Sequence, residues 1–205
     1  MKDDLIIRIE TPADYTAAEN LTREAFWNVY RPGCTEHYVL HTFRGRPEFV
    51  PELSLVMELD GKLIGHVMYV RSAIHADDGR TVPVMTFGPI SIAPEVKREG
   101  WGTVLLRESM HRAELLGAGA LAIEGNIGFY GKSGFEVAST RGIHYAAEPL
   151  DAEVPYFLIC ELKPGFLAGV TGTYQDPEGY FVDEAGAEKF DAKSSDDLTI
   201  IAAGE

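Results

Sequence analysis

A glycine-rich run, residues 97–102 (KREGWG), connects a β-rich stretch to a helical pattern. Its two glycines, Gly100 and Gly102, would let a phosphate group approach the main chain closely, because neither carries a Cβ atom. The backbone N–H groups at the start of the following helix favour an anion, and Lys97 and Arg98 add positive charge. The run therefore predicts a site for a phosphate-bearing ligand, although a plain helix-entry loop explains a short Gly-x-Gly pattern equally well.

Two other nucleotide-binding motifs fail on this sequence. A Rossmann fingerprint needs a third glycine three residues after Gly102, where Leu105 stands. A P-loop needs the pattern Gly-x4-Gly-Lys-Ser/Thr. Residues 131–133 supply its end, but Asn126 occupies the position of the first glycine.

Residues 82–138 together resemble the GNAT superfamily of acetyl-CoA-dependent N-acetyltransferases. The run 97–102 matches the family's Gln/Arg-x-x-Gly-x-Gly/Ala pyrophosphate loop, with Lys97 in place of Gln or Arg. The stretch 87–92 (FGPISI) matches the strand that carries the pantetheine arm of the cofactor. The upstream order of one strand, two helices and a β-hairpin also agrees, so the resemblance covers about residues 1–162.

A second segment, residues 125–135 (GNIGFYGKSGF), is similar to the Gly-Asn/Asp-Pro-x-Tyr-Tyr-x-x-x-Gly-Phe pattern of the predicted acetyltransferase subgroup called YhbS-like. Ile127 replaces the usual Pro, and Phe129 replaces the first Tyr. Tyr130 matches the family's proton donor to the leaving thiolate. The alternative is that Tyr130 is a packed aromatic residue beside its phenylalanine neighbours.

The resemblance implies a mixed α+β fold, in which a central mixed β-sheet is flanked by helices and two strands splay apart. Acetyl-CoA (coenzyme A) would lie in that split. Its pantetheine would add main-chain hydrogen bonds to the strand, and its pyrophosphate would sit on the amides of the loop. The expected cofactor-binding residues are Ile90, Ser91, Ile92, Lys97, Arg98, Glu99, Gly100, Trp101, Gly102, Thr103, Asn126 and Phe129. Asn126 is equally well explained as a turn former.

The implied reaction is direct attack of an acceptor amine on the thioester, with the acceptor a small molecule or a peptide. A lysine-like amine is mostly protonated at neutral pH, so a base or a desolvating site must remove its proton. The sequence does not single out that base, and Glu52 is our first candidate. Other residues in segments expected near the acceptor are Glu36, His37, His66 and Glu124.

Hydrophobic patterns predict the elements that must position these residues. The expected strands cover residues 5–9, 53–59, 63–74, 82–92, 120–123, 134–138 and 156–162. The expected helices cover 13–28, a short stretch after Thr35, and 103–116, with at most a helical turn at 129–133. Strands 84–92 and 120–123 should be parallel, because a helix connects them. Gly88-Pro89 should produce a bulge or break in the ladder.

We expect the chain of 205 residues to divide into the domain that the resemblance identifies as a GNAT acetyltransferase, residues 1–162, and a short C-terminal appendage, residues 163–205, packed on it. We expect turns there, with room for one hairpin. Four aromatic residues are too many for a solvated linker, which indicates that the appendage is ordered. No repeat is visible.

Composition limits the partners. The chain has 18 basic and 32 acidic residues and a formal net charge of −14, which argues against nucleic acid and anionic membranes as partners. Cationic amines suit this charge, and so does a role in solubility. Without a signal peptide or an apolar stretch of about 20 residues, the chain is expected to be cytoplasmic.

Cys34 and Cys160 form no Cys-x-x-Cys pair, so we predict buried thiols and no metal site. Alternatives to an enzyme are a non-catalytic acyl-CoA-binding or sensor domain and a homodimeric interaction protein.

Overall fold

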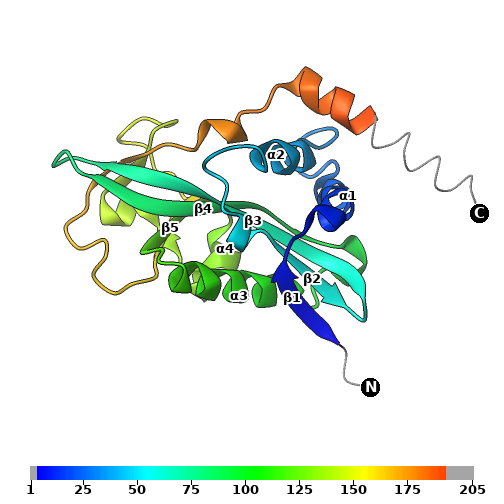
Figure 1. Ribbon diagram of the computed structural model, residues 1–205. Coiled ribbons are helices and arrows are strands. Elements are labelled where there is room, and N and C mark those ends of the chain that lie inside the picture. Colours follow the sequence, from blue (N-terminus) through cyan, green and yellow to red (C-terminus); the bar gives the residue numbers. More distant parts are fainter. Residues whose placement is uncertain (1–3, 193–205) are drawn as a thin grey trace, which may run out of the picture.

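The computed structural model describes residues 4–192, which form one mixed sheet with helices on both sides (Figure 1). Its strands are β1 (Leu5–Ile9), β2 (Leu55–Leu59), β3 (Lys62–Ala76), β4 (Thr81–Ile92), β5 (Ala120–Glu124), β6 (Glu136–Val137), β7 (Ile143–Tyr145), β8 (Phe157–Glu161) and β9 (Gly172–Tyr174). Its helices include α1 (Tyr15–Phe26), α2 (Glu36–Phe43), α3 (Trp101–Leu115) and α4 (Ile127–Tyr130), and residues 184–192 are also helical. This confirms the mixed fold that the sequence predicts.

The main path through the sheet runs in the order β1-β2-β3-β4-β5-β8-β6. The first four of these strands are antiparallel, whereas β4 and β5 are parallel, as the helix between them requires. The pairing of β4 with β5 is confined to Met85 opposite Leu121, so the two strands separate beyond that point. The predicted bulge is also present, because β4 has two residues, Gly88 and Pro89, where β3 has only Met68.

The core forms where α3 packs on the sheet. The helix turns its apolar residues Leu105, Leu106, Met110 and Ala113 toward the sheet, where they are buried. Ser109 faces inward and is satisfied by the hydroxyl of Tyr69, at 2.9 Å. Both cysteines are free and buried, as predicted.

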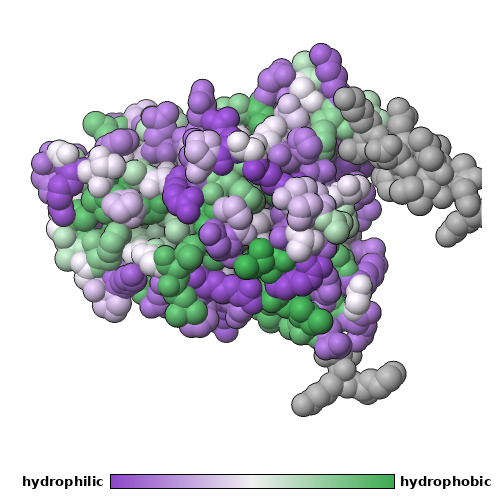
Figure 2. All heavy atoms as spheres, viewed as in Figure 1, coloured by the Kyte–Doolittle hydropathy of each residue, from purple (hydrophilic) through white to green (hydrophobic). Residues whose placement is uncertain are grey.

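The helices α1 and α2 lie on the side of the sheet opposite α3 (Figure 1). Hydrophobic side chains remain exposed on β1 and α3, namely Leu5, Ile6, Ile9 and Leu115. Hydrophobic surface is also visible in the lower part of the face in Figure 2. Within residues 4–192, no helix has the length and apolarity needed to cross a membrane.

The C-terminal segment is part of the sheet up to residue 174. β9 pairs antiparallel with β3, with Ile74 opposite Tyr174, and parallel with β7. The segment then crosses to α2, where the ring of Tyr180 lies 4.7 Å from that of Phe43 (Figure 1). The expected turns are present at residues 164–169, whereas the expectation of a hairpin is wrong, because β9 pairs with distant strands rather than with a second strand of the segment. Residues 193–205 of the expected appendage lie outside the described residues.

Candidate functional site

A cavity of about 870 Å³ opens where β4 and β5 separate. Its walls come from the second half of β4, the end of β5 with α4, the loop between α1 and α2, and the C-terminal segment. The lining residues are Phe26, Tyr30, Thr35, Glu36, Val39, Thr86, Phe87, Gly88, Pro89, Ile90, Glu124, Gly125, Asn126, Ile127, Tyr130, Pro155, Tyr156, Asp176 and Tyr180.

The second half of β4 offers the cavity an open strand edge. Beyond Met85, none of the described strands pairs with the edge of β4 that faces β5. Backbone N–H and C=O groups of such an edge can pair with an extended ligand. Ile90 lines the cavity, whereas the Ser91 hydroxyl is buried and donates to Thr22 at 3.0 Å, so it ties β4 to α1.

The glycine-rich loop leads into α3 as predicted. Gly100 is the N-cap residue and has φ +97°, a conformation that glycine adopts without strain. A Cβ atom at this position would meet no atom within 4 Å, so the space beside the loop is open. The amides of Thr103 and Val104 donate to the carbonyl oxygen of Gly100, whereas those of Trp101 and Gly102 begin the helix and have no preceding turn to donate to.

The charged side chains of the loop are arranged differently from the expectation. The Lys97 ammonium group donates to the carbonyl oxygen of Ala25 at 2.9 Å, so its charge stabilises the C-terminal end of α1. Arg98 has φ +69° and is exposed, and the indole N–H of Trp101 donates to Glu99 at 3.2 Å. Positive charge on the loop surface therefore comes from Arg98.

The residues from β5 into α4 connect the cavity with the loop. Asn126 caps α4 by accepting a hydrogen bond from the amide of Gly128 at 2.8 Å, which supports its interpretation as a turn former. A Cβ atom on Gly102 would lie 3.6 Å from the Phe129 ring, so α4 packs against the first turn of α3. Ile92 is at the same contact, 3.7 Å from that position.

Tyr130 lies in the cavity wall. Its ring packs between Phe87, Phe129 and Phe135, with centroid separations of 5.9, 4.9 and 5.6 Å. Burial raises the pKa of Tyr130 to about 12. No described residue accepts a hydrogen bond from its hydroxyl group, which leaves the proton for a ligand.

Two acidic residues that line the cavity, Glu124 and Asp176, meet at one tyrosine. The Tyr145 hydroxyl is within hydrogen-bonding distance of both the Glu124 and the Asp176 carboxylates. Burial raises the pKa of Glu124, and the neighbouring Asp176 raises it further. The sequence suggested Glu124 but gave no sign of Asp176, which stands in the segment expected to be an appendage.

Of the remaining base candidates, Glu36 lines the cavity, whereas Glu52, His37 and His66 do not. Glu52, our first candidate, is exposed in the 3-10 turn Pro51–Leu53 and does not line the cavity. His37 is buried beneath the C-terminal segment, with its ring 5.4 Å from that of Phe190, and burial lowers its pKa. Glu36 does line the cavity, where it accepts a hydrogen bond from the amide of Thr35.

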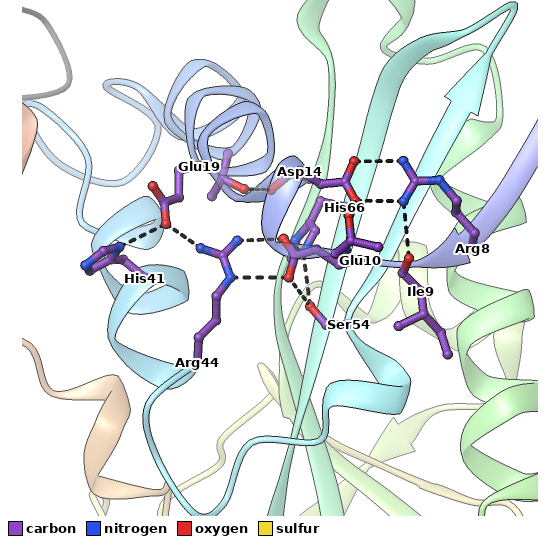
Figure 3. Close-up of polar contacts among 12 residues, drawn as sticks. Arg8, Ile9, Glu10, Asp14, Glu19, His41, Arg44, Ser54 and His66 are labelled. Atoms are coloured by element: carbon purple, nitrogen blue, oxygen red, sulfur yellow. Dashed lines mark hydrogen bonds and ion pairs between the residues drawn. The ribbon is translucent and has the colours of Figure 1, made fainter. Parts of the chain in front are cut away.

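His66 belongs to a buried polar network (Figure 3). Its ring lies 3.3 Å from the Glu10 carboxylate, which also pairs with Arg44 at 2.6 Å and accepts from Ser54 at 2.8 Å. These partners outweigh the cost of burial and lower the pKa of Glu10 to about 2. Because His66 is fully buried and outside the cavity, its part is to join β3 to the chain after β1 and to the end of α2.

Comparison with known proteins shows which family the chain matches. A family model described as "Acetyltransferase (GNAT) domain" matches residues 7–138. The uncharacterized N-acetyltransferase YjhQ of Escherichia coli strain K12 is 27% identical over 104 residues, which are 50% of this chain and 56% of that protein. The chain therefore matches little more than half the length of this curated relative.

Two solved structures resemble this one along most of the chain. The first is the GNAT family N-acetyltransferase YhbS from Escherichia coli in complex with CoA, with a TM-score of 0.75 and 23% identity, covering 88% of this chain and 93% of that one. The second is a GNAT family acetyltransferase from Brucella melitensis in complex with acetyl-CoA, with a TM-score of 0.67 and 24% identity, covering 86% of this chain and 98% of that one. At these identities the likeness concerns the fold.

Proposed function

Because the chain belongs to the GNAT acetyltransferase family, we propose that it transfers the acetyl group of acetyl-CoA to an amine bound in the cavity between β4 and β5. The family match confirms the resemblance that residues 82–138 indicate. The observation that carries the proposal is the separation of β4 from β5 beyond Met85, with Tyr130 in the wall of the resulting cavity.

The loop and the open strand edge fit acetyl-CoA. The first amides of α3 and the open space beside Gly100 suit a pyrophosphate group, to which Arg98 adds a positive charge. The edge of β4 at Ile90–Ile92 suits the amide groups of a pantetheine arm, which would extend the sheet like a short strand. The thioester would then point into the cavity, toward Tyr130.

The role of the Tyr130 hydroxyl in the departure of the thiolate follows from its raised pKa. A pKa of about 12 exceeds that of a thiol, about 8.5, by about 3.5 units, so full proton transfer to the departing sulfur would cost about 5 kcal/mol. Donation of a hydrogen bond does not carry this cost. Tyr130 therefore stabilises the thiolate as it leaves by hydrogen bonding, and water supplies the proton.

The acceptor nitrogen must be neutral when it attacks the thioester carbon. The proton of its ammonium form needs a base, and the described carboxylates that line the cavity are Glu36, Glu124 and Asp176. The new C–N bond forms as the C–S bond breaks, and the nitrogen loses a second proton to solvent.

The test is transfer itself. The protein is incubated with acetyl-CoA and a panel of small and peptide amines, products are identified by mass spectrometry, and acetyl-CoA binding is measured by calorimetry. We expect an acetylated product for at least one amine class. Tight binding of acetyl-CoA with no acetylated product from any class would instead indicate an acyl-CoA-binding or sensor domain.

A further inference from the structure

One phenol serves two carboxylates in the cavity. Glu124 ends β5, Asp176 follows β9, and the hydroxyl of Tyr145 on β7 is within hydrogen-bonding distance of both. A phenol has a single proton, so it can donate to only one of the two carboxylates at a time. The other needs a positively charged or hydrogen-bond-donating partner, or the two carboxyl groups must share a proton, a tendency seen in the pKa of Glu124, which burial and Asp176 raise.

The cavity does not provide a cationic partner. Among its lining residues there are three acids and no Lys, Arg or His. Unpaired charge in a partly buried site is costly, and here the charge is negative only. In the described part of the chain no three His, Cys, Asp or Glu side chains gather in a metal-binding cluster. The arrangement therefore calls for an organic cation rather than a metal ion.

The hydroxyl of a buried tyrosine, Tyr174, lies near Asp176. Tyr174 is fully buried, and its hydroxyl makes no well-oriented hydrogen bond to the described part of the chain. Burial and the nearby Asp176 carboxylate raise the pKa of this hydroxyl, and Ser72 and Thr86 are near enough to lower it. Asp176 and Thr86 both line the cavity, so a polar group bound there would satisfy the hydroxyl too.

The rest of the cavity is suited to an apolar body. Six of the nineteen lining residues are aromatic, namely Phe26, Tyr30, Phe87, Tyr130, Tyr156 and Tyr180. Such rings pack against apolar carbon, and their faces also attract a cation. An anionic acceptor would meet three carboxylates without a compensating charge.

We propose that Glu124 and Asp176 form the subsite for the ammonium group of the acceptor, and that the acceptor is a cationic primary amine carrying an aromatic or apolar body. The proposal deepens the acetyltransferase function and rests on it. An ammonium group has three N–H donors, enough to reach both carboxylates in addition to the Tyr145 hydroxyl.

The first experiment compares three probes that share a phenylethyl group but differ in the charge of the group attached to it. Binding of 2-phenylethylamine, 2-phenylethanol and 3-phenylpropionate to the CoA-saturated protein is measured by calorimetry. Charge-assisted hydrogen bonds in a partly buried site predict that the amine binds about 10-fold to 100-fold more tightly than the alcohol. Equal affinity for amine and alcohol in the natural protein overturns the proposal, whatever any variant does.

The second experiment assigns the preference to its residues. Glu124→Gln and Asp176→Asn keep side-chain shape and remove charge, and each should reduce the preference for the amine at least about 10-fold. Glu178→Gln is the matched control, because Glu178 is two residues from Asp176, lies outside the cavity and is exposed. Melting curves establish that each variant is folded. Folded Glu124 and Asp176 variants that keep the full preference overturn the proposal.

The two hypotheses fail separately. Selective binding of the amine without any acetylated product would overturn the acetyltransferase function and leave the ammonium subsite standing. Acetylation of 2-phenylethylamine with unchanged KM in both folded variants would support the function and overturn the subsite.

Discussion

The ring of Tyr130 lies directly against the backbone of Gly125, five residues earlier in the chain. A Cβ atom at residue 125 would come within 2.6 Å of the Tyr130 Cδ2 atom, so only glycine allows this packing. The amide of Gly125 is held in turn by the carbonyl oxygen of Tyr156 at 2.7 Å, across from β5. The position of the phenol in the cavity wall is therefore fixed by the end of the sheet.

Replacing Tyr130 by Phe should impair the chemical step and leave binding intact. The ring and its aromatic contacts are kept, while the hydrogen bond to the departing sulfur is lost. We expect kcat to fall about 100-fold, with the affinity for acetyl-CoA unchanged. Tyr38→Phe, outside the cavity on α2, is the control. Undiminished kcat, with chemistry shown to limit the rate, would reduce Tyr130 to a packing residue.

Gly100→Val should weaken acetyl-CoA binding strongly. The side chain would occupy the open space beside the loop, where we place the pyrophosphate. The positive φ also makes valine unfavourable, by about 1 to 2 kcal/mol. Gly79→Val controls for that strain, since Gly79 has φ +88° and is equally open, but stands in the β3–β4 turn. Calorimetry should show a loss of acetyl-CoA affinity in Gly100→Val alone. An equal loss of affinity in both variants would contradict a pyrophosphate site at this loop.

Acid should weaken the fold through Glu10. The folded-state pKa of Glu10, about 2, is below the ordinary 4.5. The contribution of this carboxylate to the free energy of unfolding is therefore complete above pH 4.5 and disappears as the pH falls toward 2. The shift corresponds to about 3 kcal/mol. In Glu10→Gln, the free energy of unfolding in urea should be lower at pH 7 and change less between pH 5 and about pH 2.5 than in the natural protein. Glu52→Gln, at an exposed position, should match the natural protein at each pH.

The pairing of β9 with β3 should contribute to global stability. A Cβ atom on Gly172 would lie 2.7 Å from the Cα of Ala76 and would overlap the carbonyl oxygen of His75. We expect Gly172→Ala to lower the free energy of unfolding by about 3 kcal/mol. Gly169→Ala has open space and should cost only about 1 kcal/mol, from its positive φ of 67°. If both variants unfold alike, or if proteolysis after Leu162 leaves a stable core, the segment is dispensable.

Local patterns carried much of the prediction. The helix α3, the hairpin of β2 and β3 and the loop at Gly100 follow from periodicity and from turn residues close together in the chain. The 3-10 turn Pro12–Asp14, which leads into α1, is likewise closed locally, because the Thr11 amide donates to the Asp14 carboxylate at 2.8 Å. Such features depend on interactions within one or two turns, so the sequence reveals them directly.

The sequence by itself thus determined the family, the mixed sheet and the segments at which we place acetyl-CoA. Only the tertiary structure decided which acids enter the cavity. Glu124 and Asp176 are far apart in the chain, and they meet at Tyr145 because β9 pairs with β3 and β7. Glu52, in contrast, turns outward. The physical reason is that contacts between distant residues depend on the packing of the whole chain, and no local pattern records it.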